Sequence, residues 1–231
     1  GTTIHLSSNA SIIFKDQVQS NGLDDSNINF VKSDKDPWGV IALIGKETEG
    51  SIFEFTNFSG GSGGNYDGYE FTGMFSIYSS KNINLSNLSF SDNAQYDDLI
   101  HILYSSGIKL SDSYIYDGRA DLIDIDISEM EIVNCIFKNS GNDAIDAMTS
   151  NVKITDTYIS EVGDKGLSAG ESSVVSVFNL TFDNTQIAIQ SKDGTHVSVS
   201  DSKFFNNKLQ LDAYQKNWRY GDGGKIEVDN S

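Results

Sequence analysis

A short pattern recurs along most of this chain: two apolar residues two positions apart, then Asn or Asp, then an aromatic residue or Ile. Its six regular copies are Ile83-Leu85-Asn87-Phe90, Ile108-Leu110-Asp112-Ile115, Met130-Ile132-Asn134-Phe137, Val152-Ile154-Asp156-Ile159, Val175-Val177-Asn179-Phe182 and Val197-Val199-Asp201-Phe204. Their first positions are separated by 25, 22, 22, 23 and 22 residues. A regular period of this length is typical of a solenoid in which each repeat forms one coil.

Alternation of apolar and polar residues within each copy predicts a β-strand, and a second predicted strand precedes it in each coil. The inward residues of that second strand keep the same period: Ile123, Ile145, Leu167, Ile189 and Leu211. Equal positions are therefore expected to stack as neighbouring parallel strands, roughly 4.8 Å apart. No copy has the periodicity of a helix. The predicted fold class is all-β, a single-domain right-handed parallel β-helix of roughly eight or nine coils.

The recurring Asn or Asp suits a sharp corner between strands, because these residues tolerate positive φ and form local hydrogen bonds. This row resembles the asparagine ladder of right-handed parallel β-helices in the pectin-lyase-like superfamily. The segments GDKGLSAGE, QSKDG and AYQKNWRYGDGG are also similar to the C-terminal coils of bacterial surface β-helix proteins. With one proline and no linker that divides the chain, we expect one domain over residues 1–231, regular over 75–231 and less regular over 1–74.

The charge of the chain restricts its partners. It has 33 acidic and 16 basic residues, a formal net charge of −17. Such a field repels nucleic acid and anionic membranes, and it disfavours polyanionic polysaccharides unless a cation intervenes. No apolar stretch approaches the length of a membrane span, so no membrane insertion is expected. Cys135 lies within an apolar alternation and is expected in the core rather than as a nucleophile.

Acidic residues follow one another on an outward face once the strand register is set. Asp121, Asp124, Asp143 and Asp146 are candidate metal ligands, with Asp98 and His101 in the corresponding places one coil earlier. Like charges opposite one another on adjacent strands are destabilising, and a bound Ca²⁺ would explain their proximity because it prefers carboxylate oxygens. Substrate chemistry is a second explanation, and a solvated acidic surface is a third.

Farther along the same face, two lysines are candidate catalytic bases. Lys165 is predicted to stack above Asp143. Lys192 is predicted to lie between Tyr214 in the next coil and Gly170 in the preceding coil, where the missing side chain leaves a depression. The resemblance to Ca²⁺-dependent alginate and chondroitin lyases implies such a lysine base. The G-H-G and R-x-K segments of polygalacturonases and the arginine-rich segments of pectate lyases are both missing. A row of ion pairs with neighbouring acidic residues would also account for the positions of these lysines without any catalytic role.

An aromatic segment lengthens the last coil to 29 residues. Gln190, Tyr214, Trp218 and Arg219 are candidate substrate-binding residues, because aromatic rings with a polar edge suit stacking on sugars. The alternative is that this segment caps the end of the solenoid.

The sequence therefore predicts a secreted or cell-surface β-helix protein that binds or modifies polysaccharide, with a Ca²⁺-assisted, lyase-like activity as its enzymatic form. The alternative is a non-catalytic surface scaffold or adhesion module with other surface proteins as partners. The link from fold to carbohydrate rests on analogy, so the sequence leaves open whether the protein is an enzyme.

Overall fold

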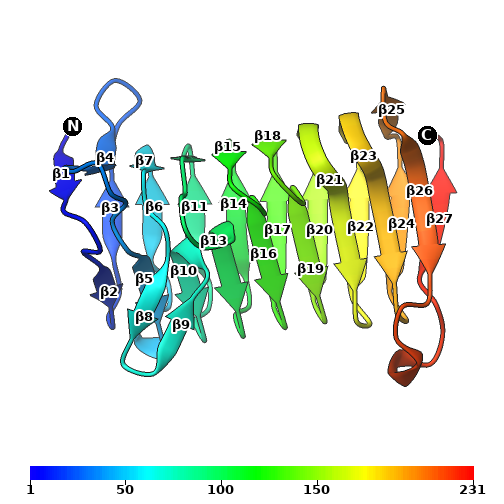
Figure 1. Ribbon diagram of the computed structural model, residues 1–231, viewed down its shortest axis with the longest axis horizontal. Coiled ribbons are helices and arrows are strands. Elements are labelled where there is room, and N and C mark those ends of the chain that lie inside the picture. Colours follow the sequence, from blue (N-terminus) through cyan, green and yellow to red (C-terminus); the bar gives the residue numbers. More distant parts are fainter.

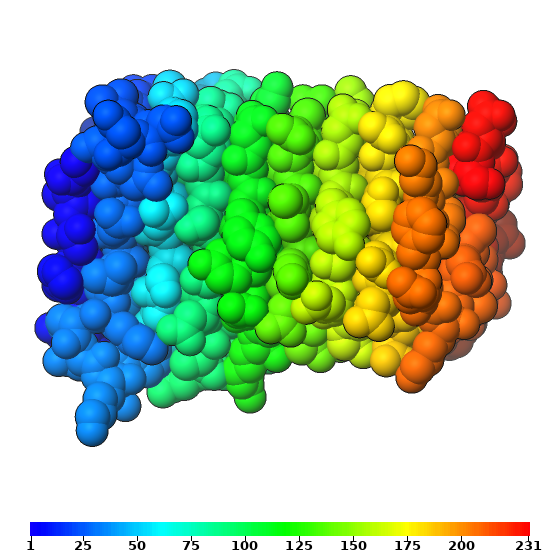
Figure 2. Space-filling view, turned by 90° about the horizontal axis from the view of Figure 1, so that it is seen from above, coloured from blue at the N-terminus to red at the C-terminus, as the bar shows by residue number.

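The computed structural model describes all 231 residues as a right-handed solenoid whose coils follow one another in sequence order (Figure 1, Figure 2). Each regular coil contributes one strand to each of three faces, which we call faces one, two and three. Two short 3₁₀ turns, η1 (Lys46–Thr48) and η2 (Trp218–Tyr220), are the helical elements. The predicted all-β fold class is confirmed.

Face two is a nine-stranded parallel sheet, one strand from each coil, which agrees with the predicted number of coils. Its strands carry the first two apolar positions of the repeat. They are β3 (Gln19–Asn21), β6 (Ile52–Glu54), β11 (Asn84–Ser86), β14 (Ile108–Ser111), β17 (Glu129–Val133), β20 (Asn151–Thr155), β22 (Val174–Phe178), β24 (His196–Ser200) and β27 (Lys225–Asp229).

Faces one and three belong to one 16-stranded sheet, because β21 (Tyr158–Gly170) and β23 (Thr181–Lys192) continue from face three to face one without a break. The remaining strands of face one are β2 (Ile12–Phe14), β5 (Ile41–Ile44), β10 (Gly73–Tyr78), β13 (Asp98–Leu103), β16 (Ile123–Asp126), β19 (Ile145–Met148) and β26 (Leu209–Tyr214). Those of face three are β1 (Thr3–Leu6), β4 (Ile28–Lys32), β7 (Thr56–Ser59), β12 (Ser89–Ser91), β15 (Tyr114–Gly118), β18 (Ile136–Ser140) and β25 (Lys203–Phe205). The strands of face three were not predicted as separate elements.

The register agrees with the repeat. Ile132, Ile154 and Val177 pair in succession on face two, as Ile123, Ile145 and Leu167 do on face one. All of these side chains are buried in one core that runs the length of the solenoid. Stacked phenylalanines extend that core, and the rings of Phe58 and Phe90 lie 4.8 Å apart.

The predicted corner residues adopt the left-handed conformation. Asn87, Asp112, Asn134, Asp156, Asn179 and Asp201 have φ values between 51° and 54°. The Asn134 amide donates to Asp112 Oδ1 at 2.7 Å, so the ladder also links adjacent coils. Cys135 is buried as predicted, and burial raises the pKa of its thiol to about 12, which leaves it protonated and unreactive.

Candidate functional site

One row of polar side chains points outward from face one. Backbone pairing aligns its members over successive coils, as the sequence predicted. We call this the polar row: Ser76, His101, Asp124, Asp146, Ser168, Gln190 and Asp212.

The polar side chains of face one are more buried than outward side chains usually are. The side chains of His101, Asp124 and Asp126 are 8%, 23% and 17% exposed. On face two, the outward Lys109 and Lys153 side chains are 50% and 62% exposed. Polar groups removed from water are stable only when they have partners, so the side chains of face one form a connected arrangement that a solvated surface does not need.

An antiparallel hairpin covers the N-terminal part of face one. Its strands are β8 (Gly64–Tyr66) and β9 (Tyr69–Phe71), whereas the glycine-rich composition of Ser59–Gly68 by itself predicts a surface loop. Phe71 packs with Val40, Ala42 and Tyr78 in a small second core on the outside of the sheet. Figure 1 shows the hairpin near the N-terminal end and the loop containing η2 near the C-terminal end, both projecting toward the same side. The open part of face one therefore begins beside the hairpin, at β13.

His101 stands at the foot of the hairpin. Its Nδ1 lies 2.7 Å from the Thr72 hydroxyl and 2.8 Å from the Tyr78 hydroxyl. Tyr78 donates its own proton to the Glu70 carbonyl at 3.0 Å. The ring therefore donates from Nδ1 to these hydroxyl oxygens, a tautomer inferred from its partners. In a neutral imidazole this leaves Nε2 free to accept a proton or bind a cation.

Two carboxylates face Nε2 of His101. Asp126 Oδ2 lies 3.4 Å away and Asp124 Oδ2 lies 3.9 Å away. One ligand atom from each of the three side chains lies within 4.8 Å of the other two, and this is the one group of His, Cys, Asp or Glu residues in the structure that could hold a metal ion. We call His101, Asp124 and Asp126 the His101 cluster.

Burial changes the acidity of the carboxyl groups near this cluster. Burial, together with the smaller effect of the negative charges of Asp98, Asp126 and Asp146, raises the pKa of Asp124 to about 9. Burial also raises the pKa of Asp98 to about 7, against smaller lowering effects of the Thr72 hydroxyl and His101. Asp124 therefore retains its proton at neutral pH and is suited to donate it.

The four predicted metal ligands occupy two different kinds of position in the structure. Asp121 Oδ1 accepts hydrogen bonds from the Asn142 amide and the Asp143 backbone N–H, at 2.7 and 2.8 Å. Asp143 Oδ1 accepts from the backbone N–H of Lys165 at 2.9 Å and from its ammonium at 3.3 Å. These two aspartates connect adjacent coils at the strand entrance, whereas Asp124 and Asp146 lie in the polar row.

Sequence reasoning placed His101 and Asp126 on this face but did not identify them as ligands. The missing signal was the tertiary position of the hairpin, which brings Thr72 and Tyr78 to the histidine.

The predicted catalytic lysines lie away from the His101 cluster. Lys165 forms ion pairs with Asp143 and Asp164, as the ion-pair alternative expected. Lys192 is on β23, four strands from His101 and so roughly 19 Å away. Its ammonium donates to Ser168 Oγ at 3.1 Å, and it pairs in register with Tyr214.

The predicted substrate-binding residues lie at the C-terminal end of the same face. The Gln190 amide donates to Asp212 Oδ2 at 2.8 Å. Trp218 is 79% exposed, and the Arg219 guanidinium lies 5.9 Å from the centre of its indole ring. A side chain so exposed does not cover the end of the core, so the tryptophan itself does not provide the alternative cap. Its role in sugar binding remains a prediction.

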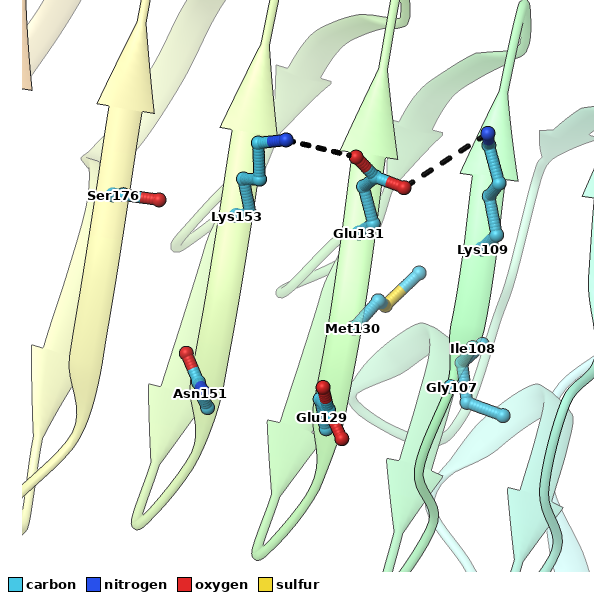
Figure 3. Close-up of a pocket in the computed structure, with 9 residues that line it drawn as sticks. All are labelled: Gly107, Ile108, Lys109, Glu129, Met130, Glu131, Asn151, Lys153 and Ser176. Carbon is cyan, nitrogen blue, oxygen red and sulfur yellow. Dashed lines mark hydrogen bonds and ion pairs between the residues drawn. The ribbon is translucent and has the colours of Figure 1, made fainter.

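A hollow with a volume of about 480 Å³ lies on face two (Figure 3). Glu131 stands between Lys109 and Lys153 there, at 3.9 and 3.2 Å. These charges are exposed and paired with one another, so they form a surface ion-pair ladder of small energetic value. We therefore take face one, where the polar groups are buried, as the candidate functional site.

Comparison with known proteins identifies the repeat. The family described as right handed beta helix region matches residues 98–230. No curated protein matches the sequence. No helix of the structure is long and apolar enough to cross a membrane.

Three solved structures are similar to this chain. A pectate lyase is 12% identical with a TM-score of 0.49, covering 99% of this chain and 68% of its own. The catalytic domain of an α-1,3-glucanase is 11% identical with a TM-score of 0.49, and the match covers 98% of this chain but 54% of the glucanase. The A-module of a mannuronan C-5 epimerase from Azotobacter vinelandii is 12% identical with a TM-score of 0.40, covering 100% of this chain and 91% of its own. None of the three contributes a residue role to this chain.

Proposed function

This chain belongs to the right-handed β-helix family, and on that scaffold we propose that it binds a polysaccharide along face one and performs acid–base chemistry on it at the His101 cluster. The observation that carries the proposal is the burial of outward-facing ionisable groups beside the hairpin. Strongly shifted carboxyl pKa values next to an open surface are characteristic of catalytic sites.

The shape of face one suits a linear polymer. The polar row offers a hydroxyl, amide, carboxyl or imidazole group in each successive coil. Coils repeat at roughly 4.8 Å, which is similar to the length of one sugar unit. A polysaccharide lying parallel to the solenoid axis would therefore meet a new polar group at each sugar. The hairpin bounds this surface at one end and the loop that carries Trp218 bounds it at the other.

The His101 cluster contains the two roles that acid–base chemistry requires. Protonated Asp124 can donate to a departing glycosidic oxygen, since its pKa is raised to about 9. His101 Nε2, with Asp126 beside it, can accept a proton from water or from a C–H bond next to a uronate carboxyl group. Removal of a proton from water leads to hydrolysis, and removal of a proton from the C–H bond leads to elimination. The lysine base predicted from the sequence is an alternative to this arrangement, in which elimination would take place at Lys165 or Lys192 and not at the His101 cluster.

We expect Asp126→Asn to lower the rate of product formation by about 100-fold or more, because it removes the carboxylate that stabilises His101 when the ring accepts the proton, and acid–base catalysis contributes at least this much. The assay uses a panel of neutral and uronate polysaccharides. New reducing ends report cleavage by either route, and the ultraviolet absorbance of an unsaturated product reports elimination alone.

Glu131→Gln is the matched control, because Glu131 occupies an outward position on face two and should leave the rate unchanged. An unchanged rate in Asp126→Asn would refute the role of the His101 cluster. Absence of both binding and turnover for the wild-type protein on every polysaccharide would support the non-catalytic scaffold instead.

A divalent cation is the second part of the proposal. Asp124 and Asp126 of the His101 cluster bring two carboxyl groups together, and Asp146 lies beside Asp124 in the polar row, so these oxygens suit Ca²⁺, whereas the imidazole nitrogen of His101 is a ligand that transition metals prefer. The predicted Ca²⁺ would displace the proton of Asp124, which would then serve as a ligand instead of as the proton donor. It would also reverse the repulsion among these acids and allow an anionic polysaccharide to approach.

We expect millimolar Ca²⁺ to raise the melting temperature, because a ligand of the folded state adds stability as its concentration rises. A chelator should lower the melting temperature, and Asp124→Asn should weaken the response to Ca²⁺. Sodium chloride at matched ionic strength separates binding from screening. If sodium reproduces the full effect, no cation site exists on this face.

The proposal also concerns location. A protein that acts on an extracellular polysaccharide would work in secreted form or at the cell surface. The acidic composition suits such a medium, because a large net charge keeps a protein soluble.

A further inference from the structure

Lys192 is a buried cation without a salt bridge. It is 9% exposed although it points outward from face one. Its ammonium donates to Ser168 Oγ at 3.1 Å and makes no other hydrogen bond within the protein. No carboxylate oxygen lies within salt-bridge distance of it, that is, within 4.0 Å. In a chain of 33 acidic residues, this isolation is unexpected.

An ammonium group has three hydrogen-bond donors, and burial is unfavourable for each donor that has no acceptor. One donor of Lys192 is satisfied by Ser168. The charge of Lys192 also acts on Glu171 and lowers its pKa, but burial has the larger effect and leaves that pKa raised. The positive charge is therefore only partly compensated, and an anionic group from outside the protein would complete its coordination.

Neighbouring residues make room for such a group. Gly170 lies in the coil before Lys192, and the lysine side chain passes over it. A Cβ at Gly170 would come within 3.3 Å of Lys192 Cε. Gln190 is 5% exposed, and its Oε1 has no hydrogen-bond donor within the protein. Tyr214 pairs with Lys192 in register and is 38% exposed. A cation and an unpaired carbonyl oxygen thus lie two residues apart on β23, and an aromatic residue pairs with the cation from the next coil.

From this geometry we infer that Lys192 forms a subsite for the carboxylate of a uronic acid unit in the polysaccharide. The carboxylate accepts from the ammonium, a sugar hydroxyl donates to Gln190, and the ring of Tyr214 contacts the apolar face of the sugar. The inference rests on the proposed function and names its substrate class. The subsite lies roughly 19 Å from His101, so it would select the polymer several sugars away from the reacting bond.

The test compares oligomers of galacturonic and mannuronic acid with the same oligomers after their carboxyl groups are reduced to neutral alcohols. Binding is measured by calorimetry, which does not depend on activity, at a fixed millimolar concentration of Ca²⁺ because the net charge of −17 disfavours polyanions in the absence of a cation. We expect the wild-type protein to prefer the acidic oligomers. Lys192→Gln should weaken their binding by about tenfold or more, which is about 1.4 kcal/mol, and leave binding of the neutral oligomers unchanged. Lys203→Gln, on face three, is the control.

Gly170→Ala provides a second variant that retains the charge. Its methyl group would lie 3.3 Å from Lys192 Cε, so the lysine side chain would have to shift slightly, and binding of the acidic oligomers should weaken by a smaller factor. If the wild-type protein binds acidic and neutral oligomers equally and Lys192→Gln changes neither, the subsite is wrong while polysaccharide binding stands. If the wild-type protein binds no oligomer or polymer, the proposed function itself fails.

Discussion

Replacement of Ile154 by aspartate is expected to abolish cooperative folding. Ile154 is fully buried on face two, between Ile132 in the preceding coil and Val177 in the next. No cationic group lies among these neighbours, so the carboxylate would be buried without a partner at a cost of several kcal/mol, or would keep its proton in an apolar core. Because domains are stable by only about 5–15 kcal/mol and adjacent coils support one another, the loss should spread.

Thermal and urea unfolding followed by circular dichroism measure this effect. Ile154→Val keeps the site apolar and should cost about 0.5–1.5 kcal/mol. Lys153→Asp places the same charge one residue away, where the side chain points to solvent and is 62% exposed. A near-wild-type transition for Ile154→Asp, or equal destabilisation by the Lys153 variant, would show that the register on face two is incorrect.

Folding stability is expected to fall as pH rises from about 4 to about 9. Burial raises the pKa of Asp143 to about 6, of Asp98 to about 7 and of Asp124 to about 9, from an ordinary value of 3.8. Within this window the folded state holds more protons than the unfolded state, so stability decreases with pH. The stabilisation is complete below pH 4 and is lost as each carboxyl group ionises. The effect of each carboxyl group is about 1.4 kcal/mol for every pH unit between its unfolded and folded pKa values.

The measurement is denaturant unfolding at several pH values, with a chelator present so that no cation binds. Asp124→Asn removes the group with the highest of these pKa values and should flatten the curve between pH 7 and 9. Asp183→Asn, on face three, is the control. Repulsion from the net charge of −17 also grows with pH, but added salt screens that repulsion and affects buried groups much less. Stability that rises through this window would contradict the burial of the three carboxyl groups.

The period of the repeat was sufficient to predict most of the fold. Each repeat contains its own alternation and its own corner residue, so the pairing of Leu110, Ile132 and Ile154 could be predicted by counting. The outward positions follow from the same count, because side chains alternate between the two sides of a strand. This is why the polar row and the pairing of Lys192 with Tyr214 were predicted in the observed order.

The strands of face three and the hairpin could not be predicted in the same way. The face-three strands, such as β15, share the aromatic or Ile position of the repeat but lack a long alternation of their own. The hairpin occurs once, in the segment from Gly64 to Phe71, and its glycines resemble those of an ordinary loop. Only its packing on Tyr78 shows that it forms a wall of the site.

The sequence by itself determined the solenoid, its register and the order of polar groups along face one, because a repeated pattern specifies the contacts between one coil and the next. The tertiary structure decided which of those groups are functional candidates. His101 meets Thr72 and Tyr78 through the hairpin, and Lys192 is buried because its side chain lies across Gly170. Burial and the resulting shifts in acidity depend on everything that surrounds a side chain, and no period in the sequence records that environment.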